Sequence, residues 1–145
     1  MIKVGNIINS EKILLVEDNH DDIKLAQRAF SKGKFCENGY GLEIVKDGME
    51  ALEYFNRGNL PKFVLLDLKI PGKDGFEILE YIRSNDRTKF VPVIILTSST
   101  EEKDIKSAYT LGANSYIRKP VDFNRFHELT QEVCSYWLKL NENPF

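Results

Sequence analysis

A chain of 145 residues fits one domain with a single hydrophobic core. Its hydrophobic share of 42% and charged share of 29%, with neither glycine nor proline in excess, are those of an ordinary globular protein. The net charge is −2, so the chain lacks the basic excess with which proteins neutralise nucleic-acid phosphates, and we expect no direct binding to nucleic acid.

The sequence also argues against a membrane-bound or secreted protein. The longest apolar runs, residues 63–66 and 93–96, are far shorter than the roughly 20 residues of a transmembrane helix. Residues 1–10 contain neither an extended apolar segment nor a small-residue cleavage site. Cys36 and Cys134 match no metal-binding spacing and are expected to be reduced thiols. We therefore expect a cytoplasmic protein without a membrane partner.

Short runs rich in β-branched residues and leucine recur along the chain and predict five strands. They cover residues 12–16, 42–45, 63–67, 93–97 and 115–118. Most of these runs are continuously apolar, which is typical of strands covered on both faces of a sheet.

Amphipathic helical patterns follow these runs. The first opens with acidic residues 21–22, which suit the positive end of a helix dipole, and the second follows the turn at residues 47–48. Apolar residues at helical spacing mark the third. The fourth opens with a capping-box pattern at residues 99–102 and ends at Gly112, and the last begins near Asp122. The alternation predicts an α/β fold, with a doubly wound parallel sheet of five strands and five helices.

Polar side chains stand at the ends of four expected strands. In open α/β sheets, ligands bind beyond the carboxyl ends of the strands, where the strand order reverses. The residues at these ends, in chain order, are Glu17, Asp18, Asp67, Thr97 and Lys119. Taken singly, an acid pair is more often a helix cap and a lysine a solvated loop charge. Their arrival together at the strand ends predicts one small pocket with three carboxylates, a hydroxyl and an ammonium group.

Such a pocket suits phosphoryl chemistry. Clustered carboxylates repel one another unless a cation offsets them, and a few oxygen ligands that leave room for water and phosphate suit Mg²⁺. Asp67 follows a rigid apolar run, and a carboxylate so placed can attack phosphorus to form an acyl phosphate. Mg²⁺ and Lys119 would neutralise the transferred group, and the Thr97 hydroxyl would supply a hydrogen bond.

Four segments closely resemble the receiver domain of bacterial and archaeal response regulators, a flavodoxin-like fold. These segments are residues 13–19 (ILLVEDN), 65–75 (LLDLKIPGKDG), 93–98 (VIILTS) and 112–120 (GANSYIRKP). The resemblance covers roughly residues 12–139. It implies a short N-terminal extension at residues 1–11, a receiver domain at 12–140 and a C-terminal tail at 141–145.

The resemblance also implies a metal site. Asp67 would be the phosphoacceptor, and Mg²⁺ would be held by Glu17, Asp18, Asp67 and the backbone carbonyl oxygen of Lys69. Lys69 stands where the family more often has a smaller polar side chain, but its backbone alone would be a ligand. The lifetime of the phosphoryl group is left open by this departure.

A switch and a phosphoryl contact follow from the same resemblance. Thr97 and Tyr116 match the family's switch pair, and Lys119 matches the lysine that contacts the phosphoryl group. The Lys119–Pro120 peptide bond is expected to be cis. The long loop at residues 31–41 and the aromatic tail at 136–138 are similar to those of small single-domain regulators paired with phytochromes and other sensor kinases.

Three other classes fit less well. Phosphatases of the haloacid-dehalogenase type also use an aspartate nucleophile and Mg²⁺, but they need a second aspartate where Lys69 stands. A flavodoxin-like FMN binder needs a hydroxyl-rich and glycine-rich loop after the first strand, whereas residues 17–22 are largely acidic. No glycine-rich nucleotide-binding loop ending in Lys-Ser/Thr is present.

We therefore expect a phosphoprotein of a two-component regulatory system, with no enzymatic activity beyond its own phosphorylation and slow autodephosphorylation. Its phosphoryl donor would be a sensor histidine kinase or a histidine phosphotransfer protein. The sequence leaves open whether it acts as a signalling output or as a shuttle in a phosphorelay. Because the sequence ends at Phe145, we expect no DNA-binding domain, and the aromatic tail favours a homodimer or a separate protein target.

Overall fold

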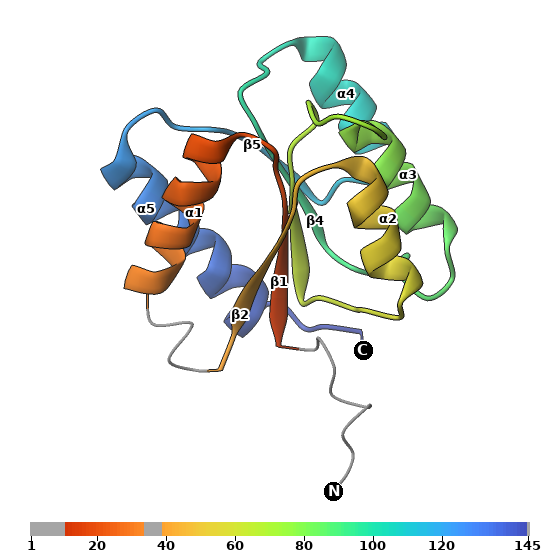
Figure 1. Cartoon of the computed structure of the whole chain (residues 1–145), viewed down its shortest axis with the longest axis horizontal. Helices are drawn as coiled ribbons and strands as arrows, with labels where there is room; N and C mark the ends of the chain where they lie inside the picture. Colours follow the sequence, from red (N-terminus) through yellow and green to blue (C-terminus); the bar gives the residue numbers. More distant parts are fainter. Residues whose placement is uncertain (1–10, 34–38, 145) are drawn as a thin grey trace, which may run out of the picture.

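The computed structural model describes residues 11–33 and 39–144 (Figure 1). Within these residues five parallel strands form one sheet in the order β2-β1-β3-β4-β5. The strands are β1 (Lys12–Val16), β2 (Gly41–Val45), β3 (Phe63–Leu66), β4 (Val93–Thr97) and β5 (Ser115–Arg118). The helices are α1 (His20–Lys32), α2 (Gly48–Asn56), α3 (Gly75–Ser84), α4 (Glu102–Thr110) and α5 (Phe123–Ser135), and a π-helical turn, η3 (Tyr136–Leu140), follows α5. The predicted fold class is confirmed.

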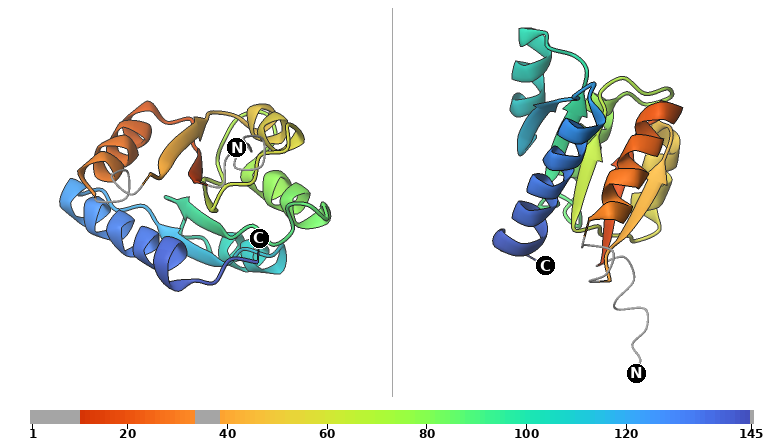
Figure 2. Two further views of the ribbon diagram at one scale, coloured as in Figure 1. Left: turned by 90° about the horizontal axis from the view of Figure 1, so that it is seen from below. Right: turned by 90° about the vertical axis from the view of Figure 1, so that its left-hand side faces the viewer.

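Helices cover both faces of the sheet. Helices α1 and α5 lie side by side over one face, and α2, α3 and α4 cover the other (Figures 1 and 2). The side chains of β1 alternate between the two layers: Leu14 and Val16 pack in the core under α2 and α3, whereas Ile13 and Leu15 pack under α1 and α5. Burial on both faces explains the continuously apolar strand sequences.

Short polar side chains fix most helix starts. Asn19, Asp47, Asp74 and Asp122 each accept a hydrogen bond from a backbone N–H three residues further on. These contacts satisfy N–H groups that a helix leaves unpaired in its first turn. The cap at Asn19 begins α1 directly after the acidic residues that follow β1, so the first turn of this helix lies beside the strand ends.

The predicted capping box before α4 is wrong. The helix begins at Glu102 after Glu101, and no side chain caps it. The hydroxyl of Ser99 donates instead to Oδ2 of Asp104, at 2.6 Å. Asp104 is a buried carboxylate and needs a hydrogen-bond donor. A capping-box pattern in the sequence does not show this need. The predicted end of α4 is confirmed, since Gly112 has a φ of 103°, a conformation that glycine adopts without strain.

The expected cis bond before Pro120 is also wrong, because every described peptide bond is trans. Before proline the cis form costs only about 0.5–1 kcal/mol relative to trans, so the contacts around the bond can decide which isomer forms. The N–H of Lys119 donates to the carbonyl of Thr97 at 2.9 Å, which continues the pairing of β5 with β4 up to the proline.

The structure describes part of the regions that contain the two cysteines and the C-terminal tail. Cys134 is a buried free thiol, and its burial raises the pKa of the thiol to about 12. Residues 34–38 of the predicted 31–41 loop, which include Cys36, and Phe145 lie outside the described residues. The loop is shorter than predicted, because α1 runs to Lys32 and β2 begins at Gly41. Trp137 packs against the cluster that contains Cys134, while Tyr136 and Leu140 are exposed. None of the helices in the described ranges combines the length and the apolar character that crossing a membrane requires.

Candidate functional site

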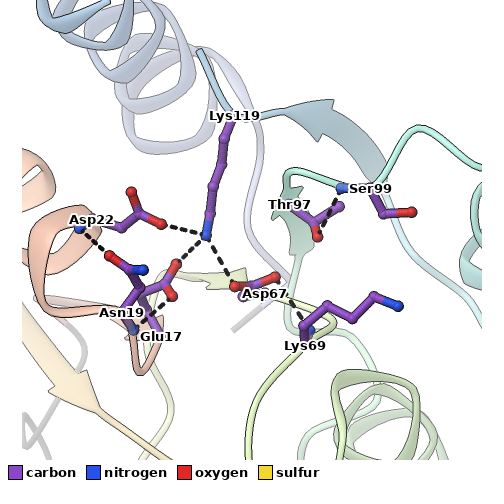
Figure 3. Close-up of polar contacts among 8 residues, drawn as sticks. All are labelled: Glu17, Asn19, Asp22, Asp67, Lys69, Thr97, Ser99 and Lys119. Atoms are coloured by element: carbon purple, nitrogen blue, oxygen red, sulfur yellow. Dashed lines mark hydrogen bonds and ion pairs between the residues drawn. The ribbon is translucent and has the colours of Figure 1, made fainter. Parts of the chain in front are cut away.

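The candidate site lies at the carboxyl ends of β1 and β3, where the strand order reverses (Figure 3). Glu17 follows β1 and Asp67 follows β3, and their side chains are almost fully buried. The backbone fixes both residues: the N–H of Glu17 donates to Val45 at 3.0 Å, and the N–H of Asp67 donates to Val16 at 3.1 Å. The sheet therefore holds two carboxylates rigidly at its edge, as the strand pattern predicted.

A third carboxylate, that of Asp18, completes a group that could hold a metal ion. We call Glu17, Asp18 and Asp67 the carboxylate trio. Each offers one oxygen that lies within 4.8 Å of the oxygens of the other two. Asp18 is exposed, so this side of the trio is open to water. Three carboxylate oxygen donors beside solvent are a set that Mg²⁺ prefers, since this ion keeps several of its waters. The residues present therefore fit the predicted metal.

Lys119 reaches the trio from beyond β5. Its ammonium nitrogen lies 2.7 Å from Oε1 of Glu17, 2.7 Å from Oδ2 of Asp22 and 2.9 Å from Oδ2 of Asp67. Burial alone would lower the pKa of Lys119, but the hydrogen bonds to Asp22, Glu17 and Asp67 outweigh it and raise the pKa above its ordinary value. Lys119 is therefore a permanent positive charge beside Asp67.

One positive charge does not offset all the carboxylates. Burial raises the pKa of Glu17 to about 7; the hydrogen bond from Lys119 lowers it in part, and the neighbouring charge of Asp67 raises it further. Glu17 is therefore costly to ionise without a further cation, and a divalent metal ion at this site would supply the missing positive charge.

Lys69 lies on the loop after β3. Its backbone N–H donates to Oδ1 of Asp67 at 3.2 Å, which orients that carboxylate, and its side chain is exposed. The role of its carbonyl oxygen as a metal ligand stays a prediction.

The predicted switch pair meets at Ser99. The hydroxyl oxygen of Thr97, which is fully buried, accepts the N–H of Ser99 at 3.4 Å. The hydroxyl of Tyr116 donates to the carbonyl oxygen of Ser99 at 3.0 Å. Ser99 also binds Asp104 of α4, so one residue links the end of β4, the ring of Tyr116 and the start of α4. A displacement of the loop at Ser99 would therefore disturb contacts of the end of β4, of the Tyr116 ring and of the start of α4.

Sequence reasoning missed two of these residues. Asp22 was explained by the helix dipole alone, although α1 begins so close to β1 that its first turn overhangs the site. Asp104 lies inside α4 and away from the strand ends, where the sequence pattern gives no reason to expect a contact with the site. The signal for Asp22 was its position only a few residues beyond Glu17, directly after a capping asparagine.

Sheet order, carboxylate trio and lysine together are the arrangement expected of the receiver class. Residues 13–131 match the model of the response regulator receiver domain, and the chain belongs to this family. Receiver domains accept phosphoryl groups from histidine kinases and are generally signalling modules rather than catalytic enzymes.

Individual relatives cover nearly the whole chain. The probable methanogenesis regulatory protein FilR2 of Methanothrix harundinacea is 38% identical over 97% of this chain and 94% of its own. The response regulator Rcp1 of Synechocystis is 33% identical over 88% of each chain. The solved structure of the phosphorylated cyanobacterial phytochrome response regulator RcpA superposes with a TM-score of 0.85 at 35% identity, over 93% of this chain and 99% of that one. Mn(2+)-bound Rcp1 gives 0.80 at 31% identity, with the same coverage. The predicted resemblance to phytochrome-associated regulators is confirmed.

Proposed function

We propose that Asp67 of this chain accepts a phosphoryl group from a phosphohistidine, on a sensor histidine kinase or a histidine phosphotransfer protein. Mg²⁺ would be held by the carboxylate trio and the Lys69 carbonyl oxygen. The observation that carries the proposal is the convergence on Asp67 of two further carboxylates and the Lys119 ammonium group. The phosphorylated state of RcpA and the Mn(2+) bound to Rcp1 support it by similarity.

The chain's residues account for the step. A carboxylate oxygen of Asp67 attacks phosphorus, the P–N bond to the donor imidazole breaks, and its electron pair stays on the imidazole. Lys119 contacts an oxygen of the transferred group, and the Thr97 hydroxyl donates a hydrogen bond to another. Mg²⁺, held by the carboxylate trio, would offset the negative charge of the phosphoryl oxygens. Asp67 needs no general base, because it reacts as a carboxylate.

We propose further that the phosphorylated protein acts in the cytoplasm by binding other proteins, through the receiver domain of residues 12–140, and turns over no substrate. The signal is the switch of Thr97 and Tyr116, which would alter the surface around α4, β5 and α5. A signalling output and a phosphorelay shuttle use the same site, and they differ in whether the phosphoryl group leaves for a second histidine.

Phosphotransfer from purified, autophosphorylated sensor kinases tests the proposal. Wild-type protein should take the group from at least one kinase in the presence of Mg²⁺, and Asp67→Asn should take none. Asp86→Asn is the matched control, since the Asp86 side chain is 99% exposed and away from the site. Equal labelling of Asp67→Asn would overturn the assignment. A chase with histidine phosphotransfer proteins separates the shuttle from the output, and steady release of phosphate from phosphate esters would indicate a phosphatase instead.

A further inference from the structure

Asp22 is a fourth carboxylate at the site, outside the carboxylate trio. It lies in the first turn of α1, and its Oδ2 is 2.7 Å from the ammonium nitrogen of Lys119 (Figure 3). Its backbone N–H donates to Oδ1 of Asn19 at 2.9 Å, so the helix cap fixes the position from which the side chain reaches Lys119. The contact is therefore held by the fold rather than by two flexible chains meeting in solvent.

The three contacts of Lys119 differ in whether the partner carboxylate would also bind a metal ion. An ammonium group has three hydrogens to donate, and here they face Glu17, Asp22 and Asp67. Glu17 and Asp67 belong to the trio, so a bound metal ion and Lys119 would share their negative charge. Among the described contacts of Lys119, Asp22 is the carboxylate that a metal ion would leave in place.

We infer that Asp22 is a positioning residue for phosphoryl transfer, which holds the Lys119 ammonium group beside Asp67 and off the metal-binding oxygens. This inference rests on the proposed function. Asp22 does not need to compete with the phosphoryl group, because one ammonium can donate to Asp22 and to phosphoryl oxygens at once. Without Asp22, Lys119 keeps Glu17 and Asp67 as partners and competes with Mg²⁺ for both.

The test compares Asp22→Asn with Asp21→Asn. Both changes remove one negative charge from the first turn of α1, so they alter the helix-dipole interaction and the long-range field alike. Asp21 is exposed, however, and is not among the described ion-pair partners of Lys119, which are Glu17, Asp22 and Asp67. We expect Asp22→Asn to lower both the Mg²⁺ affinity, measured by calorimetry without phosphodonor, and the rate of phosphorylation by acetyl phosphate by about tenfold, the scale of one charge-assisted hydrogen bond. Asp21→Asn should change either by less than about twofold.

A second background shows whether Asp22 acts through Lys119. In Lys119→Met protein, Asp22→Asn should lower the Mg²⁺ affinity no more than Asp21→Asn does, because the ammonium group that it positions is gone. Equal effects of the two aspartate changes in the wild-type background would overturn the inference. So would a tenfold loss that persists without Lys119.

The outcome for the proposed function is read separately. Failure of the wild type to be phosphorylated on Asp67 would refute the proposed function itself. Phosphorylation of the wild type with no difference between the two aspartate variants would refute the role of Asp22 alone. Circular dichroism and thermal unfolding of every variant confirm that the fold is kept.

Discussion

The ammonium nitrogen of Lys119 lies 2.9 Å from Oδ2 of Asp67, although the two residues are 52 positions apart in the chain. Strands β3 and β5 flank β4 and run parallel, so their carboxyl ends open at the same edge of the sheet. The chain thereby sets a fixed positive charge against the carboxylate that we propose as nucleophile. The Lys119 ammonium group also contacts Glu17 and Asp22. The effects of pH, of metal binding and of substitutions at the site therefore depend on all three carboxylates.

The raised pKa of Glu17 predicts a stability that depends on pH. Its folded-state pKa of about 7 exceeds the ordinary value of 4.5, so its contribution to stability is fully present below pH 4.5 and is lost as pH rises through about 7. In EDTA, the free energy of unfolding of the wild type should fall relative to Glu17→Gln over this range, by at most about 1.4 kcal/mol per pH unit, the limit for one proton. Urea unfolding across this range measures the difference, and parallel profiles for the two proteins would contradict the prediction.

The metal site predicts opposite effects of one substitution on activity and stability. Asp18→Ala removes an exposed member of the carboxylate trio, so phosphorylation by acetyl phosphate should fall at least about a hundredfold, while stability stays equal or rises because repulsion is relieved. Excess EDTA should abolish phosphorylation of the wild type, and Asp86→Ala should behave as wild type. A normal rate for Asp18→Ala, or in EDTA, would exclude the proposed site.

The site was predictable where it depends on strand ends, and unpredictable where it depends on side chains meeting across elements. Glu17 and Asp67 follow apolar strands and Lys119 follows the last strand of one parallel sheet, so the order of the elements brings all three to the carboxyl ends of the strands. Asp22 was not predicted because its place in the first turn of a helix already explained its charge, and Asp104 was not predicted because it stands at no strand end. The contact of Asp22 with Lys119 depends on tertiary packing, and the contact of Asp104 with Ser99 depends on the conformation of the loop between β4 and α4. Helix periodicity predicts neither contact.

The contact of Tyr116 with Ser99 makes the switch measurable. Phosphorylation of the wild type should draw the Thr97 hydroxyl toward a phosphoryl oxygen, move the loop at Ser99 and shift the aromatic NMR signals of Tyr116. Thr97→Ala should still be phosphorylated but lose most of that shift, whereas Thr97→Ser, which keeps a hydroxyl, should retain it. Identical Tyr116 signals in the phosphorylated and unphosphorylated wild type would refute the proposed switch.

The end of the described chain predicts an interface. Tyr136 is 48% exposed and Leu140 is 69% exposed, while Trp137 between them packs on the domain, so an apolar edge is held in a fixed orientation. Truncation after Leu138 should abolish association of the protein with itself or with its kinase, measured by sedimentation with and without an acyl-phosphate mimic.

Phe90→Ala is the control for that truncation, since it removes another exposed ring, one that is 64% accessible and lies before β4. We expect it to leave association unchanged. If wild type and truncated protein are monomeric in every state, and no kinase contact is lost, the tail only completes the fold.

The identity of the phosphorylated atom tests the account most directly. Wild-type protein is treated with acetyl phosphate and Mg²⁺, the acyl phosphate is reduced with borohydride, and the modified residue is located by peptide mass spectrometry. The account predicts that Asp67 alone is converted to homoserine, and that Asp67→Asn yields no converted residue. Conversion of another carboxylate in the wild type, or an unmodified Asp67 in protein that carries a phosphoryl group, would contradict it.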